Sequence, residues 1–490
     1  MAGLRRLAHR ALVGCLLVGV GVLVVWPSVL GGAAPWPPTL ADGGSDGRPR
    51  VDAENVSVPP AIATVHRRGV TGAGVDVGVL DVTGFDADHR ALAGHVAAAR
   101  SFADSAGVAN GGANRHGTAV AVSVAELAPD ATLHLAVAHS PADVEDAVTW
   151  FADRDVDVVV APFNSPRTPD DGSARVSAAL SDLRDDGVVV VASAGNFAQS
   201  HWRGDLSPTG DGRHRFGDAV RNRVFPAPNG PRWPADAGVW LTWNGSRFPH
   251  DLNLELYRLA RDGPELVETS RRVTTEARNV EYLGATLPSG EYYLVLDVPE
   301  RTAPHVDARP RVEVTASGVV LDRTTAGGSV TAPATARGVL GVGAVAPDGE
   351  VSAYSSRGPT ADGRRGVDVV APTDSLAGVA ALDAPGTSAA AAYAGATAAL
   401  VESADREGSA AAVERRLTRT AADRGPAGPD AVTGHGRVSP VAAVFGDDAV
   451  DGTDAAPDTV VRSDTVARSD TAAVSQLSPT ASPLRQNAST

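Results

Sequence analysis

The sequence predicts an α/β fold: a doubly wound, parallel-sheet domain that carries an inserted small β-sandwich. In two blocks, residues 61–200 and 327–446, short β-branched runs alternate with Ala-rich helical stretches. This alternation is typical of a parallel sheet with helices on both faces. Between the blocks, residues 201–326 hold alternating, aromatic-bearing strands without a helical pattern. That stretch therefore indicates antiparallel sheets inserted into the α/β domain.

The composition supports a globular protein. The chain has 490 residues, of which 43% are hydrophobic and 21% are charged. It can bury a large core and is not disordered as a whole. Its net charge of −15 argues against a nucleic-acid partner. The single cysteine excludes a disulfide framework and a cysteine zinc site.

The charged residues are unusual, because all 43 basic residues are arginine and none is lysine. A dense acidic surface stops repelling itself when high salt screens it, so this composition predicts a salt-adapted, haloarchaeon-like source. A GC-rich genome produces the same bias and stays open as an explanation. On the first interpretation, we expect activity to rise with salt.

The first 34 residues predict a signal peptide or a signal anchor. Arg5, Arg6 and Arg10 precede an apolar run over 11–26, and Pro27 ends that run. A charged region, a short apolar region and small residues are typical of an export signal. We expect an extracellular or cell-surface protein. A retained membrane anchor through residues 11–30 is the main alternative, and a buried helix is the lesser one. Residues 35–60, rich in Pro, Gly and Asp, predict a linker.

The first α/β block, residues 61–200, contains four apolar runs that predict buried parallel strands. These runs are Val75–Leu80, Leu133–Ala138, Val156–Ala161 and Val188–Ala192. Helices are expected between them over Ala142–Arg154 and Ala174–Asp186.

The insert begins with a loop-like stretch, residues 202–230, which is rich in Gly, Pro and Arg. Five strands are expected after it: Val239–Trp243, Leu252–Leu259, Val280–Leu287, Glu291–Val298 and Arg311–Thr315. Trp240 and Trp243 are expected on opposite faces of their strand, where at least one packs in the core; a binding role is the alternative.

The second α/β block, residues 327–446, predicts strands at Val339–Val345 and Val367–Val370 and a helix at Ala389–Glu402. Residues 447–490 are dominated by Ser, Thr, Ala and Asp. They predict a disordered tail.

Four polar residues lie where strands end or helices begin, which is where open α/β sheets place their sites. Asp81 ends a strand, His116 and Ser388 begin helices, and Asn196 follows a strand. Each has an ordinary structural interpretation, such as a turn for Asn196 or a helix cap for Ser388. Together, the chain order Asp, His, Ser is one of the known orders of a hydrolytic triad.

Six motifs in order carry a resemblance to a family. They are Val79-Leu-Asp81, His116-Gly-Thr118, Ala194-Gly-Asn196, Ser355-Ser-Arg-Gly-Pro359, Asp368-Val-Val-Ala-Pro372 and Gly386-Thr-Ser-Ala-Ala-Ala391. The sequence resembles the subtilases, which are subtilisin-like serine peptidases. The resemblance implies that Ser388 is the nucleophile, His116 the general base and Asp81 its orienting carboxylate. Asn196 would donate to the oxyanion.

The resemblance also implies a serine-type endopeptidase that acts on proteins or peptides as a monomer. Substrate-binding residues would be Ala161, Phe163, Asn164, Ser193, Ala194 and Gly195. No cofactor is expected for catalysis. Structural calcium, as in many subtilases, could be held by acidic loops such as the one with Asp86 and Asp88, although surface acid is the simpler interpretation.

The sequence departs from the family pattern in ways that concern activity. Val82 is an extra residue after Asp81, so the orientation of Asp81 is in question and Asp86 is a fallback acid. Pro162 removes a backbone donor from the segment that commonly pairs with substrate. Between Ala34 and Ala61 the folded propeptide of many subtilases has no room. The alternative function is therefore a catalytically idle, subtilase-like binding protein that uses its β-sandwich.

Overall fold

The structure is a computed structural model of the chain. It describes residues 58–103, 107–109, 116–166, 168–227, 233–244, 252–273, 279–299, 310–373, 386–405 and 408–446. The predicted signal or anchor, nearly all of the predicted linker and the predicted tail lie outside these ranges. Among the described residues, no helix has both the length and the apolar character that a membrane crossing requires.

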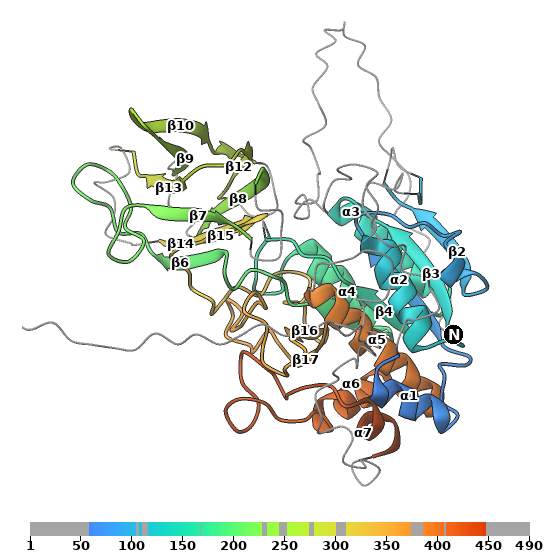
Figure 1. The fold of residues 1–490 in the computed structure, drawn as a ribbon. Helices are drawn as coiled ribbons and strands as arrows, with labels where there is room; N and C mark the ends of the chain where they lie inside the picture. Colours follow the sequence, from blue (N-terminus) through green and yellow to red (C-terminus); the bar gives the residue numbers. More distant parts are fainter. Residues whose placement is uncertain are drawn as a thin grey trace, which may run out of the picture.

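A parallel sheet of seven strands forms the centre of the α/β part (Figure 1). The strand order is β17-β16-β5-β4-β1-β3-β2, and every pair of neighbours runs parallel. The predicted α/β fold class is confirmed. The strands are β1 (Asp76–Asp81), β2 (Val96–Ser101), β3 (Thr132–Val137), β4 (Val158–Ala161), β5 (Val189–Ser193), β16 (Leu340–Val345) and β17 (Val369–Pro372).

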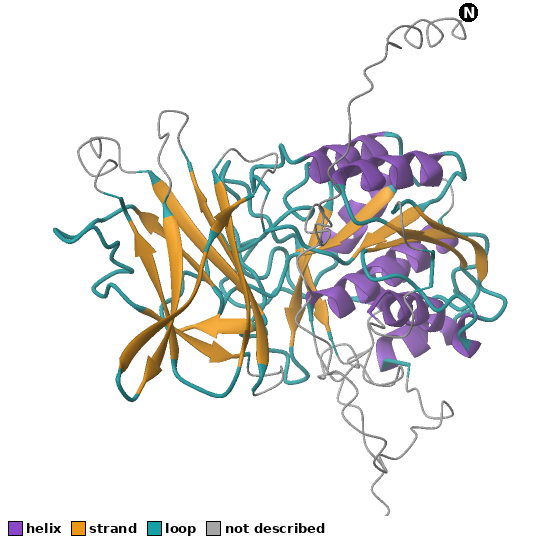
Figure 2. Cartoon of the chain, turned by 90° about the horizontal axis from the view of Figure 1, so that it is seen from above, coloured by secondary structure: helices purple, strands orange, loops and turns teal. Residues whose placement is uncertain are grey.

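Helices cover both faces of this sheet (Figure 2). One apolar cluster joins the sheet to α1, α2, α5, α6 and α7, and a second joins it to α3 and α4. The central strands are therefore buried on both sides, which explains their continuous Val-rich runs. The helices are α1 (Pro60–Arg67), α2 (His116–Leu127), α3 (Pro141–Ala152), α4 (Arg175–Asp185), α5 (Thr387–Ala404), α6 (Ala410–Arg419) and α7 (Pro440–Phe445), with a 3₁₀ turn, η2, at Arg90–Leu92.

Local sequence explains how two of these helices are placed. α3 begins with a capping box, in which the Ser140 hydroxyl and the Asp143 carboxylate satisfy each other's backbone N–H groups. α5 is buried over nearly its whole length because it is built from small residues. A Cβ at Gly395 would lie 2.3 Å from Val160 Cγ2, so α5 packs against β4 only because Gly395 lacks one.

The insert is a sandwich of two five-stranded antiparallel sheets, which stands beside the α/β part (Figure 2). Their orders are β10-β9-β13-β7-β15 and β11-β12-β8-β14-β6. One apolar cluster fills the space between them. The strands are β6 (His201–Asp205), β7 (Asn222–Pro226), β8 (Ala235–Trp243), β9 (Asn253–Ala260), β10 (Gly263–Thr269), β11 (Arg271–Arg272), β12 (Val280–Leu287), β13 (Tyr292–Asp297), β14 (Arg311–Ser317) and β15 (Val319–Leu321).

The loop-like interpretation of residues 202–230 is wrong for two segments, β6 and β7. β6 is an edge strand that pairs only with β14, and β7 alternates buried Asn222 and Val224 with exposed arginine. Such short, arginine-bearing strands offer little apolar periodicity, and their pairing comes from strands distant in the sequence.

The two tryptophans of β8 lie as the strand periodicity predicts. Trp243 belongs to the cluster between the sheets. Trp240 packs against the ring of Tyr282, with 5.3 Å between ring centroids. Both are buried, so neither offers a surface for binding a partner.

Candidate active site

Asp81 and His116 meet at the carboxyl edge of the parallel sheet. Asp81 is the last residue of β1 and is fully buried, and His116 is the first residue of α2. His116 Nδ1 lies 2.7 Å from Asp81 Oδ2, within hydrogen-bond distance. Burial favours the protonated acid, but the charge and hydrogen bond of His116, together with Thr83, outweigh it and lower the pKa of Asp81. The carboxylate is therefore kept ionised beside the imidazole.

Thr83 holds the other oxygen of the same carboxylate. Its hydroxyl donates to Asp81 Oδ1 at 2.6 Å, and its backbone N–H donates to the same atom at 2.7 Å. The Thr83 hydroxyl also accepts a hydrogen bond from the backbone N–H of Gly117 at 3.0 Å. Thr83 thus connects the acid of β1 to the turn that begins α2.

The extra residue Val82 is accommodated in the turn after β1. The chain places the hydroxyl of Thr83 on Asp81 although the two residues are not adjacent in sequence. Asp86, the alternative acid, is exposed, and its backbone N–H donates to Thr118 Oγ1. The structure therefore brings Asp81, and not Asp86, to His116.

Gly117 is required by the close approach of α2 to β1. A Cβ at this position would lie 2.4 Å from the carbonyl oxygen of Gly84 and 3.0 Å from Asp81 Cγ. Any side chain here would push His116 away from its carboxylate. This contact gives a physical reason for glycine within the His116-Gly-Thr motif.

Ser388 is the second residue of α5, and its side chain is buried beside the end of β4. Its hydroxyl donates to the carbonyl oxygen of Pro162 at 2.8 Å. The helices that begin with His116 and with Thr387 pack against each other. The structure thus sets both side chains at helix starts, with the Ser388 hydroxyl directed to Pro162 rather than to the imidazole.

The side-chain amide of Asn196 is oriented by Thr387, the residue before Ser388. Asn196 Oδ1 accepts from the backbone N–H of Thr387 at 3.0 Å and from its hydroxyl at 3.1 Å. Because the oxygen is occupied in this way, the Nδ2 group is left to donate elsewhere. A Cβ added to Gly386 would lie 3.2 Å from Asn196 Nδ2, so the amide lies directly against the start of α5.

The remaining two motifs connect strands of the parallel sheet, and the one with Ser356 holds the loop that carries Asn196. Ser356 donates its backbone N–H to the Gly195 carbonyl at 2.8 Å, and its hydroxyl accepts from the N–H of Phe197 at 3.0 Å. Asp368 accepts from the N–H of Gly341 at the start of β16. The Ser356 contacts therefore lie after the carboxyl end of β5, and the Asp368 contact joins the amino ends of β16 and β17.

The residues predicted to bind substrate gather at the neighbouring ends of β4 and β5. Asn164 donates its side-chain amide to the carbonyl oxygen of Ser193 at 2.9 Å, which ties the two segments together. Five of the six predicted residues are buried, and Asn164 is half-buried. They are Ala161, Phe163, Asn164, Ser193, Ala194 and Gly195. Their role in binding substrate stays a prediction.

Sequence reasoning missed Thr83 and Thr387, which orient the acid and the amide. A hydroxyl residue two positions after a strand-ending aspartate was the available signal for Thr83, since such side chains bond locally in turns. For Thr387, adjacency to Ser388 was the only signal. Within the described residues, no group of three or more His, Cys, Asp or Glu side chains is placed to hold a metal ion.

Comparison with known proteins assigns the family. The sequence pattern of the subtilase family, peptidase S8, matches residues 72–213 and 301–436, more than half of the chain. The chain belongs to this family of serine peptidases. Comparison with curated proteins gives no match.

Similar solved structures include three proteases. The CspB protease of Clostridium perfringens is 16% identical, with a TM-score of 0.52, and the match covers 80% of this chain and 98% of that one. A lanthipeptide protease is 18% identical, with a TM-score of 0.43 and coverage of 78% and 91%. MycP1 of Mycobacterium smegmatis is 20% identical, with a TM-score of 0.42 and coverage of 84% and 88%. The likeness to the CspB protease is a likeness of fold.

Proposed function

We propose that this subtilase is an exported serine endopeptidase that cleaves peptide bonds with Asp81, His116 and Ser388 as its triad. The observation that carries the proposal is the 2.7 Å contact of His116 with a buried carboxylate, whose second oxygen is held by Thr83. A carboxylate fixed in this way holds the imidazole in one orientation and stabilises its protonated form. Export rests on the charged and apolar pattern of the first 34 residues.

The first step forms a bond between Ser388 Oγ and the scissile carbonyl carbon. For attack, the hydroxyl turns from the Pro162 carbonyl toward His116, a rotation of χ1 between staggered positions. His116 takes the hydroxyl proton, and Asp81 stabilises the resulting imidazolium. When the tetrahedral intermediate collapses, the C–N bond breaks and His116 gives the proton to the leaving amine. Water then hydrolyses the acyl-enzyme by the same route.

The oxyanion would be bound by the Asn196 Nδ2 group and the backbone N–H of Ser388. Asn196 suits this role because Thr387 fixes its oxygen and so leaves the NH₂ group for the substrate. Ser388 lies in the first turn of α5, where backbone N–H groups lack helical partners and favour negative charge. Donors fixed before the reaction need no reorganisation as charge develops.

Covalent labelling tests the proposal directly. The full chain is incubated with a fluorophosphonate probe in molar salt, beside the variants Ser388→Ala and His116→Ala. We expect probe bound to Ser388 in the natural chain and none in either variant. Absence of labelling in a chain that circular dichroism shows to be folded would contradict the proposal. It would favour the idle binding protein instead, in which the Ser388 hydroxyl stays on Pro162.

A further inference from the structure

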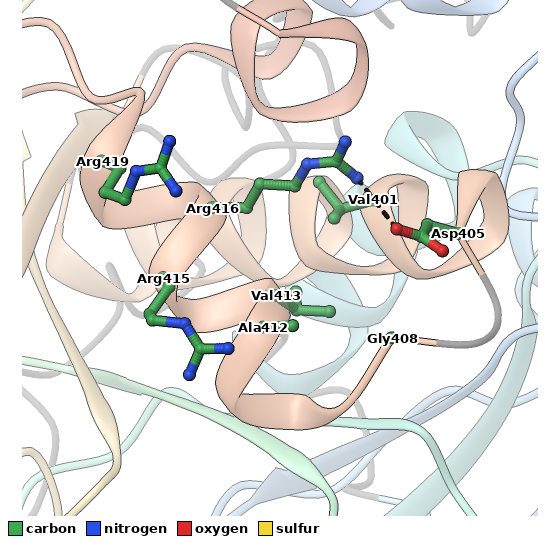
Figure 3. Close-up of a pocket in the computed structure, with 8 residues that line it drawn as sticks. All are labelled: Val401, Asp405, Gly408, Ala412, Val413, Arg415, Arg416 and Arg419. Atoms are coloured by element: carbon green, nitrogen blue, oxygen red, sulfur yellow. Dashed lines mark ion pairs between the residues drawn. The ribbon is translucent and has the colours of Figure 1, made fainter.

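A cavity lined by arginine lies away from the candidate active site, between the end of α5 and α6 (Figure 3). Its volume is about 200 Å³, and its apolar lining includes Val401 and Val413. Arg415, Arg416 and Arg419 extend from α6 around it. These positions recur at helical spacing, so the three side chains share one side of the helix. The cavity combines a small apolar lining with cationic side chains.

Among the described residues, one of the three arginines at this cavity forms an ion pair. Asp405 is the one acidic residue among the described residues that line the cavity, and it lies 3.5 Å from Arg416 (Figure 3). In the part of the chain that the structure describes, Arg415 and Arg419 have no carboxylate within 4.0 Å. The whole chain has a net charge of −15, so it offers many carboxylates that could pair with these arginines. Guanidinium groups favour carboxylates, which they can bind through two parallel hydrogen bonds.

An acidic stretch of the same chain follows a helix that contacts both elements of this cavity. α7 ends at Phe445 and packs against both α5 and α6. Residues 447–461 follow, with five aspartates (Asp447, Asp448, Asp451, Asp454 and Asp458) and no basic residue. The next basic residue is Arg462.

The acidic stretch is long enough to reach the arginines. An 18-residue helix such as α5 is about 27 Å long. Twelve extended residues span up to about 40 Å. Because α7 packs against α5, residues 447–458 can span the length of α5 and so reach the cavity at its end.

We propose that residues 447–461 bind in this cavity, with aspartate carboxylates paired to Arg415 and Arg419. The occupant is part of the same chain, so the effective concentration is on the order of 1 mM. If the isolated segment binds with Kd on the order of 0.1 mM, the tethered segment occupies the cavity about 90% of the time. The segment is thereby held on the catalytic domain, and this inference does not depend on catalysis.

A peptide-binding experiment in the full chain tests the proposal. All proteins carry Ser388→Ala, so that no peptide is cleaved. The probe is a fluorescein-labelled peptide with the sequence of residues 447–461, and anisotropy is measured at the lowest salt at which the chain stays folded. In one variant, the five aspartates of the chain's own segment are changed to asparagine. We expect this variant to bind the peptide about tenfold more tightly than the chain with its natural segment, because the competing segment is removed.

Two double variants, one at the cavity and one elsewhere, test whether the peptide binds at the arginines of α6. In the variant with the neutralised segment, Arg415→Gln with Arg419→Gln should weaken peptide binding at least tenfold. Arg221→Gln with Arg223→Gln, two exposed arginines of the β-sandwich, is the matched control and should leave binding unchanged. If the double variant does not fold, Arg419→Gln alone is measured instead, and we expect it to lose less affinity for the peptide.

Two results would overturn the proposal. Equal affinity of the natural and neutralised chains would mean that the natural segment does not occupy the cavity. Equal loss in the control pair and in the Arg415 and Arg419 pair would mean that the peptide responds to general positive charge. A peptide with asparagine at all five aspartate positions should not bind, and binding by it would exclude carboxylate recognition.

Discussion

Replacing Thr83 with valine isolates the contribution of its hydroxyl to the candidate active site. Valine keeps the branched shape of the side chain but removes the O–H that donates to Asp81 Oδ1 at 2.6 Å. The same change removes the acceptor of the Gly117 N–H. The backbone N–H of Thr83 still reaches Asp81 Oδ1, so the carboxylate loses one of its two donors from this residue.

The expected loss follows from the kind of hydrogen bond that is removed. A hydrogen bond to a charged group contributes about 1.5–3 kcal/mol. Each 1.36 kcal/mol lost from transition-state stabilisation is a factor of ten in rate. Because Asp81 stabilises the imidazolium that forms during attack, we expect kcat/KM to fall about ten- to a hundredfold. The unpaired Gly117 N–H should also lower the free energy of unfolding by about 1–3 kcal/mol.

The assay measures the second-order rate of labelling by a fluorophosphonate and the hydrolysis of a fluorogenic peptide, each in molar salt. Thr83→Ser restores the hydroxyl and is the matched control, and it should stay within about threefold of the natural chain. Asp81→Asn gives the lowest activity expected in this series, because loss of the carboxylate charge in such a triad lowers kcat by about 10⁴. Full activity of Thr83→Val, or equal impairment of Thr83→Ser, would refute the assigned role of the hydroxyl.

Four further outcomes are expected. Asn196→Ala should lower kcat by about 10²–10³, the range found when such a donor is lost from a subtilisin, and single-turnover acylation would measure it. Gly395→Ala should destabilise the chain by about 1–3 kcal/mol, because the new Cβ meets Val160, and Val160→Ala in the same chain should recover part of this in urea unfolding. Burial and the charge of Glu313 raise the pKa of Asp170 to about 7. The folded chain therefore favours protonated Asp170, and this contribution to the free energy of unfolding is lost as pH rises through that value. Asp170→Asn should therefore raise Tm at pH 8, with the gain vanishing toward pH 4. Finally, both activity and Tm should be higher in molar salt than in 0.1 M salt, since screening relieves a net charge of −15; equal values would contradict salt adaptation.

The sequence predicted the α/β elements well because burial on both faces leaves a strong local signal. The apolar run at Val188–Ala192 needs no partner to be recognised, and it corresponds to β5 at Val189–Ser193. β6 and β7 carried no such signal, because arginine interrupts their apolar residues and their partners lie far along the chain. The local pattern therefore identifies continuously apolar strands more reliably than strands that carry charged residues.

In the candidate site, too, local sequence predicted the positions of the residues, whereas contacts with other segments decide the orientation of their side chains. Asp81, His116, Asn196 and Ser388 could be named because each lies at an end of an element that the pattern located. The orientation of their side chains could not be predicted, since it depends on contacts such as the one from Thr83 across the turn. The extra residue Val82 put the orientation of Asp81 in question. Only the path of the turn shows that the hydroxyl still reaches its carboxylate.

The long gap between Asn196 and Ser388 has little bearing on the geometry of the site, because the two ends of the insert lie side by side. The backbone N–H of Leu321 donates to the carbonyl of Gln199, and that of Thr325 donates to His201. In the parallel sheet, β5 and β16 are hydrogen-bonded neighbours although the strands of the sandwich separate them in sequence. To the α/β part, the sandwich is therefore equivalent to a short connection between β5 and β16. Loop closure costs little more for a long insert than for a short one, and here the insert closes its own ends with strand pairing. The Asn196 loop thus takes its position from Ser356 and Thr387, both in the second α/β block, and not from the length of chain that separates them.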